Sequence, residues 1–131
     1  MSKVASETAQ AFFGVTANTG RELVKVLWHL NDDNIIYKRR EGGIEFRHKG
    51  RLIAQRLRVG EPTETLILDS QWGDGTFRRL EAILALCGTR LRNDGGWPWR
   101  LGKYLWKGRV VTLTVERHRR GWRKLDVVFS E

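Results

Sequence analysis

Apolar residues recur at helical spacing in three segments of the chain. Residues 5–13 are rich in Ala, Glu and Gln, and Gly14 is placed to end a helix. The run RELVKVLWHL, residues 21–30, has Leu and Val at helical spacing after a capping box, Thr-x-x-Glu, that starts at Thr19. A further helix is predicted from Asp74 onward, over FRRLEAILALC. The pattern therefore predicts two helices in the N-terminal third and one inserted later.

Elsewhere the period changes to two, which is typical of strands with one buried face. Strands are predicted over residues 35–40, 43–59 (a hairpin), 65–71, 89–92, 103–116 (a hairpin over Lys107-Gly108) and 122–129. We therefore expect an α+β fold, an antiparallel sheet of about six strands with the two N-terminal helices and the inserted helix packed on one face.

In the hairpin predicted over residues 43–59, the position of the turn would set the pairing register of the two strands. If Lys49 and Gly50 form a two-residue turn, Phe46 pairs with Ile53 and Ile44 with Gln55. Arg47, Arg56 and Arg58 then share the opposite face. This register predicts an amphipathic sheet with an exposed cationic side.

The length of 131 residues predicts a single domain, residues 1–131, with one modest core. No apolar run approaches the roughly 20 residues of a membrane span, and the N-terminal residues lack the apolar core of a signal peptide. We therefore expect a cytoplasmic protein without a membrane partner. Cys87 is the one cysteine, it lies on the apolar stripe of the inserted helix, and we expect a buried, unreactive thiol.

Positive charge is concentrated in two blocks of the chain. Residues 37–58 hold eight Lys and Arg against two Glu, and residues 97–124 hold nine against one Glu, so the remaining residues are net acidic. Such segregation usually marks a polyanionic partner. The alternative is a set of solvated strand faces. The candidate phosphate contacts of the first block are Arg39, Arg40, Arg47, Lys49, Arg56 and Arg58.

The stretch RHRRGWRK, residues 117–124, is the densest cationic segment. A turn with Gly121 in a positive-φ conformation would join two strands here and project the neighbouring cations into solvent. The candidate contacts are Arg117, Arg119, Arg120 and Arg123. We interpret this tip as a wing lying along a nucleic-acid backbone; the alternative is an edge hairpin kept charged to prevent strand addition.

Six tryptophans are present, and four of them fall in the second basic block. Aromatic rings interleaved with Arg and Lys are what stacking on unpaired bases requires. Trp97, Trp99 and Trp122 are therefore candidate stacking residues. The alternative is that these rings pack loops against the sheet, because Trp is mostly buried.

Catalytic motifs are missing from the sequence. It contains no H-E-x-x-H, G-x-S-x-G or phosphate-binding glycine loop, and no Cys/His cluster with zinc spacing. Asp69, Asp74 and Glu81 are carboxylates that Mg²⁺ could use, but an acid at a strand end or helix start is expected for capping alone. We therefore predict a protein that is not an enzyme and that uses no metal or cofactor.

The order IEFRHKGRLIA, then TLILDSQWGDGTFRRLEAIL, then TRLR, spans residues 44–92. It resembles small proteins encoded by bacteriophages and other mobile elements, which pair such a hairpin with a Trp-led turn and a Leu-rich helix. The resemblance brings no active site with it. It implies a phage or plasmid setting, in which small proteins often bind and block host machinery, including CRISPR complexes.

The sequence therefore favours a non-catalytic nucleic-acid-binding protein of low base specificity, for RNA or DNA, single- or double-stranded. The alternative is a phage-encoded inhibitor that binds and blocks a host nucleic-acid-binding complex, as anti-CRISPR proteins do.

Overall fold

A computed structural model describes residues 3–16, 23–29, 32–71, 74–119 and 121–130. Its two helices among these residues are α1 (Lys3–Gly14) and α2 (Asp74–Leu86). The longer strands are β1 (Leu23–His29), β2 (Asp32–Lys38), β3 (Ile44–His48), β4 (Arg51–Leu57), β5 (Thr63–Asp69), β9 (Val110–His118) and β10 (Gly121–Ser130). Three short strands lie between α2 and β9: β6 (Leu91–Arg92), β7 (Arg100–Leu101) and β8 (Tyr104–Leu105).

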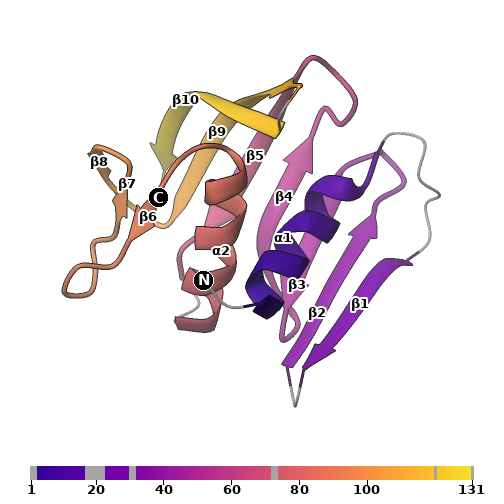
Figure 1. Cartoon of the computed structure of the whole chain (residues 1–131), viewed down its shortest axis with the longest axis horizontal. Helices are drawn as coiled ribbons and strands as arrows, with labels where there is room; N and C mark the ends of the chain where they lie inside the picture. Colours follow the sequence, from indigo (N-terminus) through magenta and orange to yellow (C-terminus); the bar gives the residue numbers. More distant parts are fainter. Residues whose placement is uncertain (1–2, 17–22, 30–31, 72–73, 120, 131) are drawn as a thin grey trace.

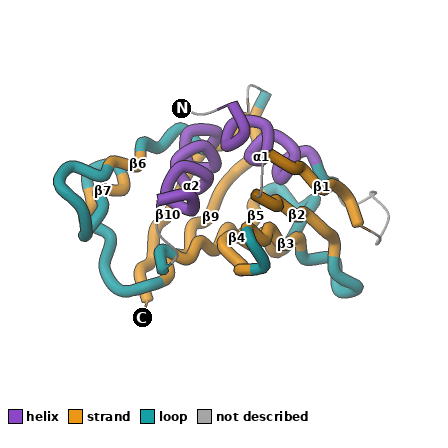
Figure 2. The backbone as a smooth tube through the Cα atoms, turned by 90° about the horizontal axis from the view of Figure 1, so that it is seen from below, coloured by secondary structure: helices purple, strands orange, loops and turns teal. Residues whose placement is uncertain are grey.

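The longer strands form one antiparallel sheet of seven strands in the order β1-β2-β3-β4-β5-β9-β10. Both helices lie on the same face of this sheet (Figure 1 and Figure 2). The α+β class and the antiparallel sheet are thus confirmed, with one strand more than the expected six or so.

Alternation along the strands places the core between the sheet and the helices. Burial in β5 and β9 alternates residue by residue, so that Leu66, Leu68, Leu113 and Val115 are buried, while Ile67 and Thr114 between them are only partly buried. The helices contribute apolar stripes to the same core, including Phe12 of α1. The apolar side chains therefore determine which face of the sheet the helices cover, and the opposite face is left without helices.

The second N-terminal helix was wrongly predicted. Residues 23–29 form β1, which pairs with β2 as a hairpin; the capping box at residues 19–22 lies outside the described residues. This segment alternates Val24, Val26 and Trp28, and β-branched and aromatic residues favour strands when a partner strand is present. The ladder to β2 supplies that partner, so pairing across the hairpin overrides the helical spacing.

A β-bulge changes the predicted register of the β3–β4 hairpin. The turn is as expected, with His48 opposite Arg51, but the register shifts between Phe46 and Arg47, and Ile44 faces Arg56 rather than Gln55. Because directly opposed residues share a face, the one-residue shift moves Arg56 to the helix-covered side. The exposed cationic face predicted from the sequence therefore lacks Arg56.

The small sheet β6-β7-β8 packs beside α2 and the β9–β10 hairpin (Figure 1). The predicted hairpin over Lys107-Gly108 is wrong, because β8 pairs with β7 and belongs to the small sheet, whereas β9 joins the large one. Trp106 is 1% exposed and lies edge-on against Trp99, with ring centroids 5.7 Å apart. These indoles contact Phe77 of α2 and Phe129 of β10, so they attach the small sheet to the body of the protein.

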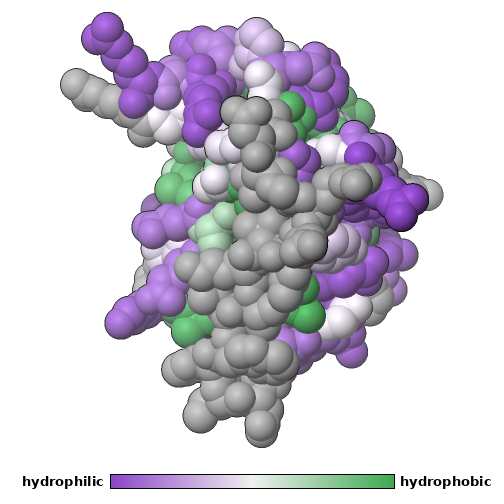
Figure 3. Space-filling view, turned by 90° about the vertical axis from the view of Figure 1, so that its right-hand side faces the viewer, coloured by the Kyte–Doolittle hydropathy of each residue, from purple (hydrophilic) through white to green (hydrophobic). Residues whose placement is uncertain are grey.

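Hydrophilic side chains cover most of the described surface seen from the β1 side, and apolar ones show only in small separate areas (Figure 3). Among the described residues, none of the helices is long and apolar enough to cross a membrane.

Candidate nucleic-acid interface

A cleft of about 510 Å³ lies between the small sheet and strand β10, the edge of the large sheet. Its size falls within the roughly 300–1,000 Å³ typical of ligand pockets. The β7–β8 side contributes Arg100, Lys103, Tyr104, Leu105 and the following Lys107, and β10 contributes Lys124, Leu125, Asp126, Val127 and Phe129. We call it the β8–β10 cleft.

The charge of the β8–β10 cleft is strongly positive. Four of its ten lining residues are cationic and one, Asp126, is acidic. Asp126 accepts a hydrogen bond from the backbone N–H of Val127, and the four cations make no ion pair with any described carboxylate. Their charge is therefore available to an anion that enters the cleft.

Tyr104 is the aromatic residue that the β8–β10 cleft exposes most, at 42% of its surface. The ammonium groups of Lys103 and Lys124 lie 5.4 Å and 5.6 Å from the centre of its ring. These cation–π contacts join the two walls of the cleft through one ring. Leu105 and Leu125 are also half-exposed, so the cleft combines cations with apolar surface.

The hairpin tip of β9 and β10 extends the positive surface. The predicted hairpin is confirmed, with His118 opposite Gly121, whose φ is +139°. Arg117 and Arg119 are exposed, and the guanidinium of Arg117 lies 5.3 Å from the ring centre of Trp122. Arg123 forms an ion pair of 2.9 Å with Glu116, and the candidate Arg120 lies outside the described residues.

In the first basic block, most candidate cations already have partners. Arg39 pairs with Glu41 at 2.6 Å and Glu45 at 2.9 Å, while Arg47 donates to the hydroxyl of Tyr37 at 3.0 Å. Glu45 also accepts a hydrogen bond from Tyr37. Burial opposes the ionised form of Glu45, but the hydrogen bonds from Tyr37 and Arg39 outweigh it and lower its pKa. A carboxylate at the centre of the group therefore neutralises part of the block.

The remaining exposed candidates of this block lie at turns. Arg40 is exposed in the turn between β2 and β3. Lys49 and Arg58 take positive φ values of 53° and 56°, and Arg58 donates to the hydroxyl of Thr65 at 2.9 Å and 3.1 Å. The turns of Arg40 and Arg58 lie at one end of the sheet and that of Lys49 at the other, because successive strands are antiparallel. These three exposed candidates of the first block are therefore divided between two ends of the sheet.

Arg56 is not a surface contact, and its prediction as a phosphate ligand is corrected. The residue is 2% exposed, and its guanidinium meets Glu64 at 2.9 Å and 3.1 Å. Its Nη1 group donates to the backbone carbonyls of Phe12 at 2.6 Å and Val15 at 2.9 Å. Carbonyls at a helix C-terminus lack partners within the helix, so Arg56 satisfies them and attaches α1 to the sheet.

Two of the three candidate stacking tryptophans are buried. Trp99 is 6% exposed in the tryptophan cluster, and Trp122 is 7% exposed, packed against Phe13 and Arg56. The alternative interpretation, that these rings pack loops and strands, therefore describes Trp99 and Trp122. Trp97 is 52% exposed and lies edge-on to Trp99, with centroids 5.3 Å apart. It remains a candidate stacking residue.

Sequence reasoning missed the residues that line the β8–β10 cleft. Arg100, Lys103, Lys107 and Lys124 were counted in the second block, and none was singled out as a contact. One signal was present: Lys103-Tyr104 places a cation beside an aromatic ring after Gly102, at a turn. The facing wall comes from residues some twenty positions later, which no local pattern connects to the first wall.

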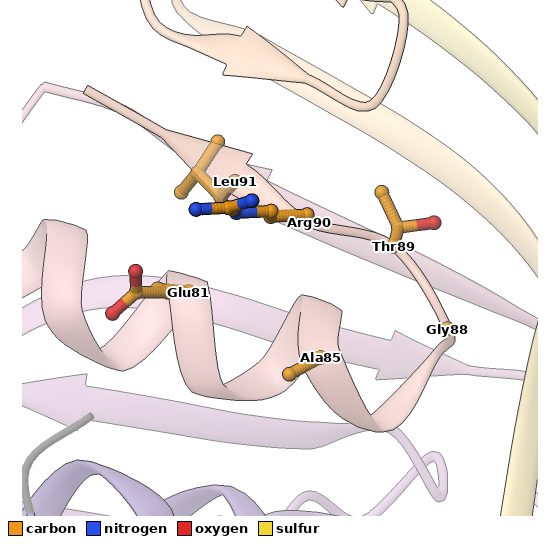
Figure 4. Close-up of a pocket in the computed structure, with 6 residues that line it drawn as sticks. All are labelled: Glu81, Ala85, Gly88, Thr89, Arg90 and Leu91. Carbon is orange, nitrogen blue, oxygen red and sulfur yellow. The ribbon is translucent and has the colours of Figure 1, made fainter. Parts of the chain in front are cut away.

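Two other hollows carry less chemistry. One of about 390 Å³ between α2 and β6 is lined by Glu81 and Arg90, whose charged side chains lie on the same side of it, and by Thr89 and small or apolar residues (Figure 4). Another, of about 290 Å³, lies on the open sheet face beside Asp69, which pairs with Arg109 at 2.8 Å. Within the described residues, no three His, Cys, Asp or Glu side chains come together as metal ligands.

Cys87 is buried, as the helical stripe predicted, with 1% of its surface exposed. Burial raises the pKa of its thiol to about 12. Since the thiolate is the reactive form, the low reactivity expected from the sequence stays a prediction with a clear physical basis.

No family model matches the chain, and comparisons with curated proteins and with solved structures return no match. Function is therefore inferred from the geometry described above.

Proposed function

We propose that this protein binds nucleic acid with low base specificity, through phosphate contacts in the β8–β10 cleft and at the adjoining hairpin tip. The observation that carries the proposal is the group of four cations that face one cleft without a carboxylate partner among the described residues. Holding like charges together is unfavourable, and phosphates that enter the cleft relieve the repulsion.

Low base specificity follows from the kind of cation present. Three of the four cleft cations are lysines, which act as mobile point charges rather than as the planar fork that reads a base edge. Contacts to phosphate position the nucleic acid and carry no sequence information directly. The exposed Arg117 and Arg119 would add further backbone contacts from the hairpin tip.

The experiment is a salt titration of binding by the full chain. Fluorescence anisotropy of labelled duplex and single-stranded oligonucleotides of mixed sequence would give the affinity between low and physiological salt. With four to five phosphates neutralised, the slope of log affinity against log salt should be roughly −4 for duplex and −3 for single strands. Sequence changes in the probe should matter little.

A flat salt dependence, or no binding at low salt, would contradict the proposal. It would favour the alternative drawn from the phage-like resemblance, in which a host protein complex is the target. A pull-down from lysate with and without nuclease treatment separates the two, because a protein target survives the nuclease.

A further inference from the structure

We infer that the β8–β10 cleft is a site for single-stranded nucleic acid, in which the ring of Tyr104 stacks on one base while the surrounding cations hold the flanking phosphates. This inference rests on the proposed function and names the form of nucleic acid that the site takes. It assigns the stacking role to Tyr104, which neither the two basic blocks nor the positions of the tryptophans indicate.

The first argument for stacking is that the ring of Tyr104 is accessible to a ligand. The ring is 42% exposed, whereas Trp99, Trp106 and Trp122 are each at most 7% exposed. Tyr104 therefore offers a ring to a ligand where the buried tryptophans cannot. A base has an apolar face that stacks on such a ring whatever its identity, which fits a site of low base specificity.

The second argument is that cations surround the Tyr104 ring and can bind the phosphates on either side of a stacked base. Lys103 lies on one wall and Lys124 on the other, each with its ammonium within 5.6 Å of the ring centre. An exposed cation–π contact is weak, so a phosphate can draw either flexible side chain away from the ring and leave a face for the base. Arg100 and Lys107 line the same cleft and can hold the neighbouring phosphates.

The shape and the remaining lining of the cleft favour a single strand over a duplex. A cleft of about 510 Å³ can take up a single nucleotide-sized group, whereas two paired strands can only lay their phosphates across its opening. Leu105, Leu125, Val127 and Phe129 give it apolar surface, which suits an unstacked base. In a duplex the bases stack on one another and present only their edges, so no base face reaches Tyr104.

The test compares Tyr104→Ala with the wild-type chain on two single-stranded probes, an oligothymidylate of about a dozen nucleotides and an abasic strand of the same length. Loss of stacking should weaken oligothymidylate binding roughly 5- to 150-fold. Binding of the abasic strand should change less than about twofold, since that strand has phosphates without bases. Tyr104→Phe keeps the ring and should bind like wild type.

Two further variants control for structure and for position. Tyr104→Leu keeps an apolar side chain without an aromatic ring and should lose affinity as the alanine variant does, with an unchanged melting temperature. Trp97→Ala removes the other large aromatic ring that is exposed among the described residues; Trp97 does not line the cleft, so this change should weaken oligothymidylate binding much less than Tyr104→Ala does.

Equal losses on both probes, or no loss of oligothymidylate binding in Tyr104→Ala and Tyr104→Leu, would overturn the inference while leaving the proposed function standing. A loss confined to Trp97→Ala would also overturn it, by moving the stacking to Trp97. If the wild-type chain binds neither probe nor duplex at low salt, the proposed function itself fails.

Discussion

The two basic blocks look alike along the sequence and differ in the folded protein. In residues 37–58 the cations are largely engaged within the protein: Arg56 with Glu64, Arg39 with Glu45, and Arg47 with Tyr37. In residues 97–124, four cations line one cleft and have no carboxylate partner among the described residues. Both blocks contribute charge, but the second offers more of it to a ligand.

The position of each block in the sheet explains the difference. The strands of the first block lie inside the large sheet, where each has a neighbour on both sides and its side chains meet those of the next strand. The second block includes β10, at the edge, and the small sheet beside it. An edge leaves room for a cleft between two elements, and cations from both elements can face that space.

A count of charges along the sequence thus predicts a polyanionic partner but does not locate the binding site for that partner on the protein. A guanidinium already held by a carboxylate gives little net attraction to a phosphate, and leaving the carboxylate alone would be unfavourable. Three changes would break or sharpen the contrast between the blocks.

The largest effect is expected for Arg56→Met. Removing the guanidinium leaves the buried Glu64 carboxylate and the carbonyls of Phe12 and Val15 without their partner, which should lower the free energy of unfolding by about 3–5 kcal/mol. Denaturant unfolding measures this. Arg56→Lys should restore little, because an ammonium cannot span both carboxylate oxygens.

Arg40→Met is the control, since Arg40 is exposed in a turn and its loss should change stability by no more than about 0.5 kcal/mol. Replacing both partners, Arg56→Met with Glu64→Met, should be less harmful than the single change. A loss below about 1 kcal/mol for Arg56→Met alone would mean that the pair does not attach α1 to the sheet.

An intermediate effect is expected when two cleft cations are removed. Lys103→Ala with Lys107→Ala should weaken binding of nucleic acid and reduce the salt slope by about two units, one for each phosphate that the cleft no longer neutralises. Arg39→Ala with Arg40→Ala is the matched control, with the same change in net charge in the first block, and it should alter the slope much less. Equal effects of the two pairs would show that general charge, and not the cleft, governs binding.

The smallest effect is expected for Glu45→Gln. This change removes the carboxylate that holds Arg39 and contacts Arg47, so the first block should gain some affinity and its salt slope should steepen by less than about one unit. Binding measured at neutral pH, in parallel with the wild type, tests this. Unchanged binding would mean that these two arginines are turned away from the ligand.

Stability against pH provides a second measurement on the same variant. The folded pKa of Glu45 is lowered from its ordinary value of 4.5, so its ionised form stabilises the fold above that pH. This contribution is lost as the pH falls through the lowered folded pKa. Glu45→Gln should lack that acid-dependent loss, and an identical acid unfolding profile would contradict the role given to the carboxylate.

The sequence by itself determined the elements whose pattern is unambiguous. Period-two alternation in residues 63–69 and 110–118 predicts strands with one buried face, because successive side chains point to opposite sides. The helical stripe that includes Leu80, Leu84 and Cys87 predicts a buried thiol, because those positions share one face of a helix. The two basic blocks and the hairpin at Gly121 were likewise readable from composition and turn chemistry.

Only the tertiary structure decided the rest, since each remaining feature depends on contacts between distant residues. Residues 23–29 became a strand because β2 pairs with them, and Arg56 turned inward because one extra residue in β4 shifts the register by one. The β8–β10 cleft needs Lys103 and Lys124 to face each other around Tyr104. Local sequence propensity cannot predict this contact, because the two walls of the cleft belong to separate sheets. The buried tryptophans fix how those sheets pack against each other.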